Sequence, residues 1–168
     1  MNRWKRTAIV LAITFLQVGL CRAENLANSL LGSWRLISYK AEYSDGSVAD
    51  LYGPSPLGVI SYDATGHMFV HVMKTNLPKC GTIDRRKCPD KQARLAFDNS
   101  FAYWGRYEVE PSEKTVLHYV QGASWPDFIG ISQKRFIEVS GKRLTITTPR
   151  RKIGGMENVG VLVWERIE

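Results

Sequence analysis

The sequence predicts an all-β protein, a single antiparallel up-and-down β-barrel of eight or nine strands. The first observation is a succession of short segments with alternating apolar and polar residues, each ended by turn residues, with no long amphipathic helix among them. The second is a pair of motifs at the two ends of this region, Gly-Ser-Trp at 32–34 and Trp-Glu-Arg at 164–166. The first and last strands of a closed barrel are neighbours. Arg166 is therefore expected to lie over the Trp34 indole and close one end.

The first 23 residues have the three-part pattern of a secretory signal peptide. A basic head precedes a mostly apolar run at 7–20, and Ala23 supplies a small residue at the expected cleavage site. The run is short for a membrane span, and no later segment is apolar enough for one. We therefore expect an exported, periplasmic or extracellular protein with one domain at 24–168. An uncleaved anchor and a lipid-anchored Cys21 are the alternatives.

Four strands are expected in the first half of the domain, after a lead-in at 25–31 with room for one helical turn. Their ranges, read from the alternation of apolar and polar residues, are 33–43, 48–52, 58–62 and 67–74. Asp63 and Gly66 mark the turn of a clear hairpin between the last two. The alternation in the first strand places Ser38 on the same face as Trp34.

A polar segment at 75–100 interrupts the strands and has room for one short helix near 90–97. Segments of this length between strands are usually functional or covering loops. The segment contains Cys80 and Cys88, an even pair that predicts a structural disulfide in an exported domain. A loop of about nine residues closed in this way contributes about 2.5 kcal/mol. The spacing fits neither a zinc site nor a Cys-x-x-Cys redox motif.

The second half of the domain repeats the pattern of strands and turns. Its expected strands are 101–109, 115–122, 128–139, 143–148 and 159–167. Turn residues at 110–114 and 140–142 join neighbouring strands, and loops at 124–127 and 149–158 separate the others. The regular spacing of short strands favours a barrel or sandwich over alternating βαβ units, and the terminal Trp–Arg pair favours the barrel.

Short motifs run through the domain in a fixed order. They lie at 31–38 (Leu-Gly-Ser-Trp-Arg-Leu-Ile-Ser), 53–58, 60–63, 66–68, 103–109 (Tyr-Trp-Gly-Arg-Tyr-Glu-Val), 116–118, 125–130 (Trp-Pro-Asp-Phe-Ile-Gly), 135–136, 141–145 and 163–166. In these motifs the chain resembles the bacterial and fungal lipocalin-like domain family, a relative of lipocalins and fatty-acid-binding proteins. The resemblance implies a calycin-type barrel with an internal cavity, but it implies no particular activity. The cysteine-bearing segment between Lys79 and Lys91 departs from the family pattern and is expected to reshape the cavity mouth.

The charge balance argues against a nucleic-acid partner. The whole chain has a net charge of +7, but the first 23 residues hold four of its basic residues and none of its acids. The remaining domain has 19 basic and 16 acidic residues, a net charge of +3. Nucleic-acid recognition needs a basic stripe on the folded domain. The basic clusters at 85–87 and 150–152 fall in turn-rich segments, where solvated loop charges are expected.

Five residues are candidate polar contacts for a ligand inside the barrel. They are Tyr62, Tyr103, Tyr107, His118 and Arg135. A mostly apolar cavity with a few placed polar groups is the usual composition of a small-molecule site. Ordinary core packing is the alternative for the tyrosines, and a hydrogen-bonded core histidine is the alternative for His118.

A charge in the middle of a strand, as at Arg135, must meet either water or a partner. If Arg135 faces inward, the partner could be a ligand carboxylate or a nearby acid such as Glu108. The alternation does not settle the direction, because Phe136 competes for the inner face and a bulge could shift the register.

Two further residue pairs have possible binding roles. Trp125 and Phe128 flank a Pro-Asp turn, where they could form an aromatic rim at the cavity mouth or a hydrophobic lid over the core. His67 and His71 share a strand face and could supply two metal ligands, but the sequence offers no third ligand with them. We therefore expect neither a metal nor another cofactor.

These observations predict an exported binder of a small apolar or amphipathic molecule. The first alternative is a small isomerase or cyclase on the same barrel, in which His118 and Tyr107 or Tyr103 transfer a proton. The second is a protein-interaction module that uses the outer face or the cysteine loop. The sequence contains no nucleophile elbow, phosphate-binding glycine loop or carboxylate pair at a diagnostic spacing.

Overall fold

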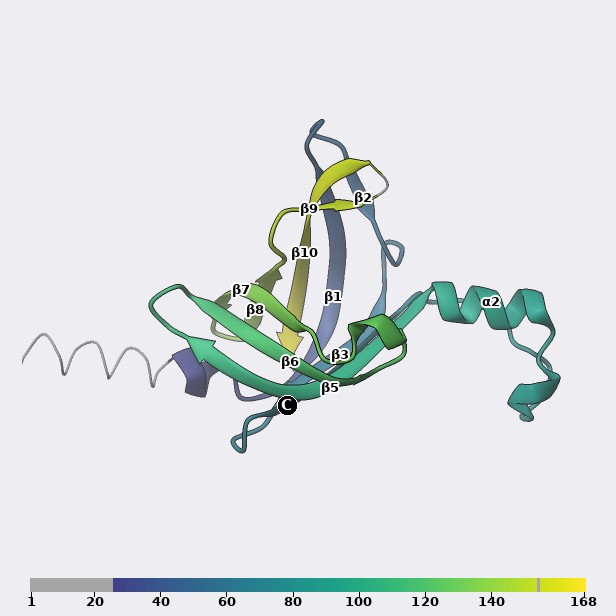
Figure 1. Ribbon diagram of the computed structural model, residues 1–168, viewed down its shortest axis with the longest axis horizontal. Helices are drawn as coiled ribbons and strands as arrows, with labels where there is room; N and C mark the ends of the chain where they lie inside the picture. Colours follow the sequence, from purple (N-terminus) through teal and green to yellow (C-terminus); the bar gives the residue numbers. More distant parts are fainter. Residues whose placement is uncertain (1–25, 154) are drawn as a thin grey trace, which may run out of the picture.

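The barrel closes by antiparallel pairing between its first and last long strands. The computed structural model describes residues 26–153 and 155–168, and in these residues ten strands form one antiparallel sheet (Figure 1). The strands are β1 (Gly32–Tyr43), β2 (Val48–Asp50), β3 (Leu57–Tyr62), β4 (His67–Met73), β5 (Ser100–Glu110), β6 (Thr115–Ala123), β7 (Ser132–Ser140), β8 (Arg143–Thr147), β9 (Arg151–Ile153) and β10 (Met156–Arg166). The sheet order is β2-β1-β3-β4-β5-β6-β7-β8-β10-β9, and β1 also pairs with β10. Eight strands therefore form the closed barrel, with β2 and β9 as short additions, which confirms the predicted fold class.

Most strands begin and end within one or two residues of the predicted bounds, and the differences lie in two connections. Among the helical segments of the described residues, η1 (Arg85–Lys87) and α2 (Asp90–Asp98) lie between β4 and β5, and η2 (Pro126–Phe128) lies between β6 and β7. β7 begins at Ser132 rather than at residue 128, because Phe128 belongs to η2 and Gly130 turns the chain with a positive φ of 86°. The expected loop at 149–158 contains the hairpin of β9 with the start of β10.

A β-bulge in β1 changes which side chains face the interior. Trp34 and Leu36 point inward and are buried. The register with β10 shifts between Leu36 and Ser38, and beyond this point Tyr39 and Ala41 face the interior. The prediction that Ser38 shares a face with Trp34 is therefore wrong, because the extra residue of the bulge reverses the alternation.

One end of the barrel is closed by Trp34 and Arg166. The Arg166 Cζ atom lies 4.0 Å from the centre of the Trp34 ring, and Trp34 is fully buried. The Arg166 guanidinium also donates to the carbonyls of Leu31 and Ser29, each at 2.6 Å. The position of Arg166 over Trp34 confirms the contact that the terminal motifs predict. The two hydrogen bonds, which the sequence did not predict, join the last strand to the lead-in before the first strand.

The interior next to this closed end is a packed core. Its largest fully buried side chains are Trp34, Trp164, Tyr62, Leu30, Ile60, Leu144, His118, Val116 and Thr115. Full burial of a large apolar side chain contributes about 1.5–3 kcal/mol to stability. Space for a ligand is therefore found toward the opposite end of the barrel.

The segment between β4 and β5 projects from the barrel. Figure 1 shows α2 extending beyond the start of β5, and every residue of α2 is at least partly exposed. Cys80 and Cys88 form a disulfide in this segment, which confirms the predicted pairing and is compatible with export. In the described residues, no helix is long and apolar enough to cross a membrane. The predicted signal peptide lies outside the described residues.

Candidate functional site

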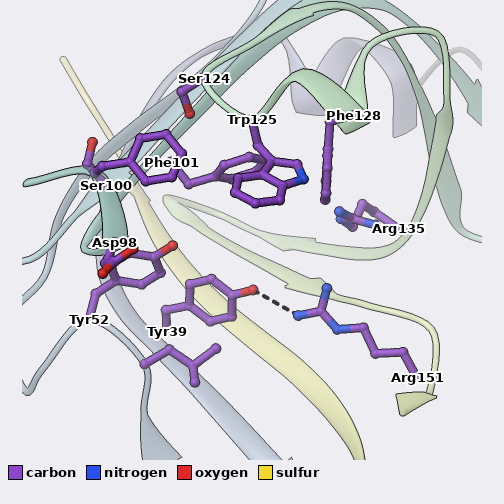
Figure 2. Close-up of a pocket in the computed structure, with 12 residues that line it drawn as sticks. Tyr39, Tyr52, Asp98, Ser100, Phe101, Ser124, Trp125, Phe128, Arg135 and Arg151 are labelled. Atoms are coloured by element: carbon purple, nitrogen blue, oxygen red, sulfur yellow. Dashed lines mark hydrogen bonds between the residues drawn. The ribbon is translucent and has the colours of Figure 1, made fainter. Parts of the chain in front are cut away.

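The open end of the barrel, opposite the Trp34–Arg166 contact, holds a pocket of about 460 Å³ (Figure 2). Its lining side chains come from strands and connections that are far apart in the sequence. They are Tyr39, Leu51, Tyr52, Phe97, Asp98, Ser100, Phe101, Ser124, Trp125, Phe128, Arg135 and Arg151. Small-molecule sites usually have volumes of roughly 300–1,000 Å³. The pocket is therefore large enough for one small ligand.

Aromatic rings form two walls of this pocket. Phe101 and Phe128 meet edge to face with their ring centres 4.8 Å apart, and Tyr39 stacks on Tyr52 at 5.6 Å. Figure 2 shows Trp125 beside the two phenylalanines, across the pocket from the two tyrosines. Burial raises the pKa of Tyr52 to about 12, and the neighbouring Tyr39 adds to the shift. Both walls thus present uncharged, flat surfaces on which an aromatic group can stack.

The guanidinium of Arg135 is buried, and it forms no ion pair with any of the described residues. Arg135 faces the interior and is 9% exposed, whereas Phe136 faces outward. The Nη1 group donates to the Lys134 carbonyl and the Nη2 group to the Gln133 side-chain oxygen, each at 2.8 Å. Among the residues that the structure describes, no carboxylate lies within ion-pair distance of this guanidinium.

Glu108, the acid that the sequence offered as a partner for Arg135, has a different contact. Its Oε2 atom accepts a hydrogen bond of 2.9 Å from the Tyr119 hydroxyl on the exposed face of the sheet. Glu108 and Arg135 therefore lie on opposite faces of the barrel wall. The expectation that Glu108 neutralises Arg135 is wrong.

Arg151 brings a second guanidinium to the pocket. Its Nη2 group donates to the Tyr39 hydroxyl at 3.4 Å, and its Nε atom is buried with no hydrogen-bond partner in the described part of the chain. The expectation that the cluster at 150–152 is a solvated loop is wrong for this residue, because β9 turns its side chain toward the pocket. Figure 2 places Arg135 and Arg151 on the same side of the pocket, away from Asp98 and Ser100.

A smaller cavity of about 50 Å³ lies deeper in the barrel. Its lining residues are Tyr39, Ile60, Val70, Val72, Phe101, Tyr103, His118, Arg135, Ile146, Thr148, Leu162 and Trp164. Three of these residues, Tyr39, Phe101 and Arg135, also line the outer pocket. They form the boundary between the two spaces, so Arg135 can contact a group in either one.

His118 is held between two tyrosines at this inner cavity. Its Nε2 atom lies 2.9 Å from the Tyr62 hydroxyl, and its Nδ1 atom lies 2.9 Å from the Tyr103 hydroxyl. All three side chains are buried. A neutral imidazole has one N–H donor and one acceptor nitrogen. One tyrosine hydroxyl therefore donates to His118 and the other accepts from it.

Burial keeps the side chains of His118, Tyr62 and Tyr103 uncharged. It lowers the pKa of His118 to about 3, and the positive charge of Arg135 adds to the shift. It also raises the pKa of Tyr103, and raises that of Tyr62 well above its ordinary value. A general acid or base works best with a pKa near the operating pH. His118 in this environment is therefore suited to holding the tyrosines in place rather than to transferring protons near neutral pH.

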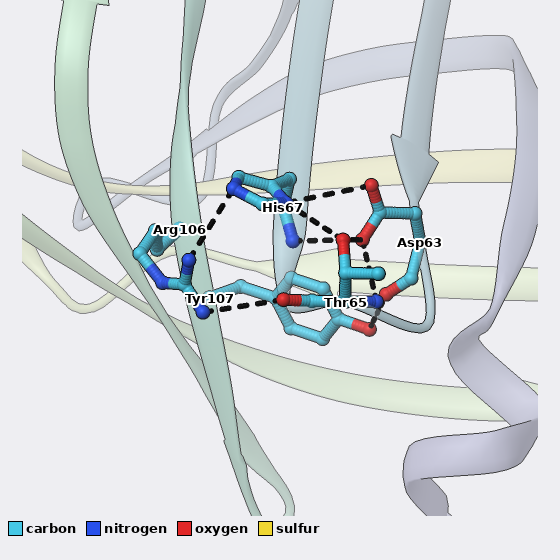
Figure 3. Close-up of polar contacts among 5 residues, drawn as sticks. All are labelled: Asp63, Thr65, His67, Arg106 and Tyr107. Atoms are coloured by element: carbon cyan, nitrogen blue, oxygen red, sulfur yellow. Dashed lines mark hydrogen bonds and ion pairs between the residues drawn. The ribbon is translucent and has the colours of Figure 1, made fainter.

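Tyr107 and His67 belong to a polar cluster at the closed end (Figure 3). The Asp63 Oδ1 atom accepts hydrogen bonds from the Thr65 N–H, the Thr65 hydroxyl and the His67 N–H, at 2.8–2.9 Å. The Tyr107 hydroxyl donates to the Asp63 carbonyl at 2.8 Å, and Arg106 donates to the Thr65 carbonyl at 3.2 Å. These bonds join the turn between β3 and β4 to β5. The cluster thus holds the end of the barrel together.

The two histidines of β4 are engaged by different neighbours. The His67 Nδ1 atom lies 2.8 Å from the Thr65 hydroxyl, and the His71 Nε2 atom lies 2.8 Å from the Ser100 hydroxyl. Within residues 26–153 and 155–168, no three His, Cys, Asp or Glu side chains gather as metal ligands.

The structure brings together four of the five candidate polar residues. Arg135, Tyr103 and His118 line the inner cavity, and Tyr62 contacts His118, whereas Tyr107 lines neither space. Trp125 and Phe128 lie at the pocket mouth. The lining residues that sequence reasoning missed include Tyr39, Tyr52, Phe101 and Arg151. Tyr39 was missed because the bulge in β1 turns it inward, and Arg151 was missed because strand β9 was not expected. A sequence signal was available only for Phe101, which alternates with Tyr103 on the same strand.

The chain is similar to known proteins along most of its length. A carrier protein for 4'-hydroxy-3'-methoxypropiophenone from Aspergillus oryzae (strain ATCC 42149 / RIB 40) is 28% identical over 107 residues, which are 60% of this chain and 96% of the relative. A lipocalin-like protein from Bacteroides uniformis ATCC 8492 has a crystal structure with a TM-score of 0.43 and 12% identity, over 83% of this chain and 99% of that one. The lipocalin-like domain family matches residues 31–167, which include all the barrel strands. The chain therefore belongs to the lipocalin-like domain family.

Proposed function

We propose that this protein binds and carries one small amphipathic molecule with an aromatic group, held in the pocket at the open end of the barrel. The observation that carries the proposal is the combination of a pocket of about 460 Å³, two aromatic walls and a polar side formed by buried groups. Pockets of this composition bind small ligands by burying apolar surface and fixing orientation through a few polar contacts.

Two comparisons support a binding role. The family to which the chain belongs has a barrel of the kind that can enclose one small ligand. The relative from Aspergillus oryzae is named a carrier for an aryl ketone with one phenol group. A molecule of that class has a flat ring for the aromatic walls and oxygen atoms that can accept hydrogen bonds from guanidinium groups.

Intrinsic fluorescence tests the proposal with 4'-hydroxy-3'-methoxypropiophenone and the anionic dye 1-anilinonaphthalene-8-sulfonate as probes. Each probe should quench tryptophan emission in a saturable way, with calorimetry giving one site per chain. Trp125 lines the pocket, whereas Trp104 is 55% exposed on the outer face of the barrel. The Trp125→Phe variant should therefore lose most of the quenching, and the matched Trp104→Phe variant should keep it. Absence of saturable binding for both probes would exclude the proposed function.

We also propose that the protein is exported after removal of residues 1–23. The disulfide between Cys80 and Cys88 supports an oxidising compartment, and the charge and hydropathy pattern at 1–23 supports a cleaved leader. Cell fractionation followed by N-terminal sequencing tests this. We expect a non-cytoplasmic protein that begins at Glu24, and an intact leader on a cytoplasmic protein would contradict the proposal.

A further inference from the structure

We propose that the ligand is an organic carboxylate, with its aromatic part in the outer pocket and its carboxylate on the guanidinium of Arg135. This inference rests on the proposed binding function and specifies the chemical class of the ligand. It follows from the charge, the hydrogen bonding and the position of three groups at the boundary between the two spaces.

The buried charge of Arg135 favours an anionic ligand. An arginine guanidinium has five N–H donors, and two hydrogen bonds to protein groups are present at this residue. Both acceptors, the Lys134 carbonyl and the Gln133 side-chain oxygen, are uncharged. Burial of a charge is costly unless an opposite charge compensates it. A ligand anion at Arg135 would supply that compensation.

The same side of the pocket has a further N–H donor available to a ligand. The buried Nε atom of Arg151 has no hydrogen-bond partner among the described residues. The one acidic residue of the pocket lining, Asp98, already pairs with Arg94 at 2.8 Å and lies on the far side in Figure 2. The electrostatic field on the Arg135 side therefore favours an anion.

The sizes of the two spaces also fit a carboxylate attached to an aromatic group. The inner cavity of about 50 Å³ is too small for an aromatic ring but has room for a group about the size of one or two water molecules. Arg135 borders this cavity and the outer pocket, and uncharged Tyr103 and His118 line its other sides. A carboxylate placed there would keep the attached aromatic group between Tyr39 and Phe101.

A carboxylate fits this site better than a phenol does. The ordinary pKa of a carboxyl group is about 4, so it is ionised near pH 7, whereas the pKa of a phenol is about 10 and it stays neutral. Two parallel hydrogen bonds between a carboxylate and a guanidinium also have better geometry than a single bond to a phenol oxygen. The charge of the ligand is therefore the property that the experiment must vary.

Calorimetric titration of the folded protein with 3-phenylpropanoate and 3-phenylpropanamide at pH 7 tests the inference. The two compounds have nearly the same shape, and only the first is charged. A charge-assisted hydrogen bond contributes about 1.5–3 kcal/mol, so the carboxylate should bind at least about tenfold more tightly than the amide. The Arg135→Gln variant should reduce this ratio to within about twofold.

Arg150→Gln is the matched control, because Arg150 is exposed and its ion-pair partner is Glu157 at the surface. This variant should keep the wild-type preference for the carboxylate. Thermal unfolding provides a second measurement: without ligand, Arg135→Gln should be at least as stable as the wild type, since it removes a buried unpaired charge. Excess 3-phenylpropanoate should raise the melting temperature of the wild type but not that of the variant.

The outcomes separate this inference from the proposed function. Binding of neither compound, together with failure of the fluorescence test, would exclude the binding function itself. Equal affinity for the carboxylate and the amide, or an unchanged ratio in Arg135→Gln, would overturn the inference and leave a binder of neutral molecules. A preference that is lost in Arg150→Gln as well would show a general surface-charge effect and would also overturn it.

Discussion

His118 shows how a single buried residue can carry a large pH dependence. Its pKa is lowered to about 3 by burial and by the Arg135 charge, while an unfolded histidine titrates near 6.5. Between these values the unfolded chain binds the extra proton and the folded chain does not. Stability is therefore greatest above about pH 6.5 and falls as the pH decreases toward 3.

Because of His118, we expect the free energy of unfolding to decrease by about 3 kcal/mol when the pH is lowered from 7 to 4. Urea denaturation at several pH values measures the slope, and the His118→Gln variant is the comparison because it cannot take up the proton. The variant should lose less stability on acidification than the wild type. Equal slopes for the two proteins, or a His118 NMR resonance that titrates near pH 6.5, would contradict the assignment.

Arg166 is expected to stabilise the closed end through its contacts with Trp34 and the two lead-in carbonyls. The Arg166→Met variant should lose about 3 kcal/mol, because it removes a cation–π contact and two charge-assisted hydrogen bonds. Arg35→Met is the matched control, since Arg35 pairs with Glu165 on the exposed outer face and such pairs contribute at most about 1 kcal/mol. Chemical denaturation compares the two; equal losses would show that the end contact has no special role.

At the residue scale, the sequence predicted which polar residues are present better than it predicted what they contact. His118 and Tyr103 were identified, but the bond between them required the register of β5 and β6. The inward direction of Arg135 could not be read from alternation, because Arg135 and Phe136 are adjacent and each is plausible on the inner face. Only the packed structure shows that Phe136 is the exposed one.

At the scale of strands, two bulges shape the barrel. The bulge in β1 turns Tyr39 inward, and a second irregularity in β5 lies between Trp104 and Gly105. At Gly105 the backbones approach so closely that an added Cβ atom would lie 1.9 Å from the Tyr119 carbonyl oxygen. This approach explains why a glycine occupies a buried strand position.

The Gly105→Ala variant should therefore lose about 3 kcal/mol or more, because the backbone of β6 would have to move. Gly160→Ala is the control in another buried strand position. The three atoms nearest to its added Cβ atom are side-chain atoms of Thr148 and Tyr39, at 3.1–3.3 Å, which can shift more easily. Urea denaturation should give a clearly smaller loss for Gly160→Ala, and the reverse order would refute the close approach at β5.

The disulfide segment should be largely independent of the barrel. None of the residues of α2 is buried, so loosening this segment leaves the core intact. Replacing Cys80 and Cys88 by serine should lower the stability of the barrel by less than the loop-closure value of about 2.5 kcal/mol. Hydrogen exchange should become faster in α2 and stay unchanged in β5. A full loss of 2.5 kcal/mol in barrel unfolding would show instead that the two parts unfold together.

The order of strands was predictable because alternation and turn residues determine it locally. The additional strand β9 and the late start of β7 were not, because both depend on pairing with distant segments or on the local turn at Pro126. The effect on the site was direct. Arg151 was assigned to a loop, and β9 instead brings it to the pocket beside Tyr39.

At the scale of the whole molecule, the two ends of the barrel differ in structure. The Trp34–Arg166 contact and the cluster around Asp63 close one end. The other end keeps a pocket with aromatic walls and two guanidinium groups. Sequence motifs predicted the closed barrel, whereas the shape of the pocket depends on connections of irregular length and could not be predicted from them.

Two-dimensional ¹H–¹⁵N NMR with saturating 3-phenylpropanoate tests whether a ligand occupies the open end of the barrel. We expect the largest chemical-shift changes at Tyr39, Phe101, Trp125 and Arg135, with little change at the Asp63 turn. Changes confined to the outer face around Trp104, or no saturable changes at all, would contradict it.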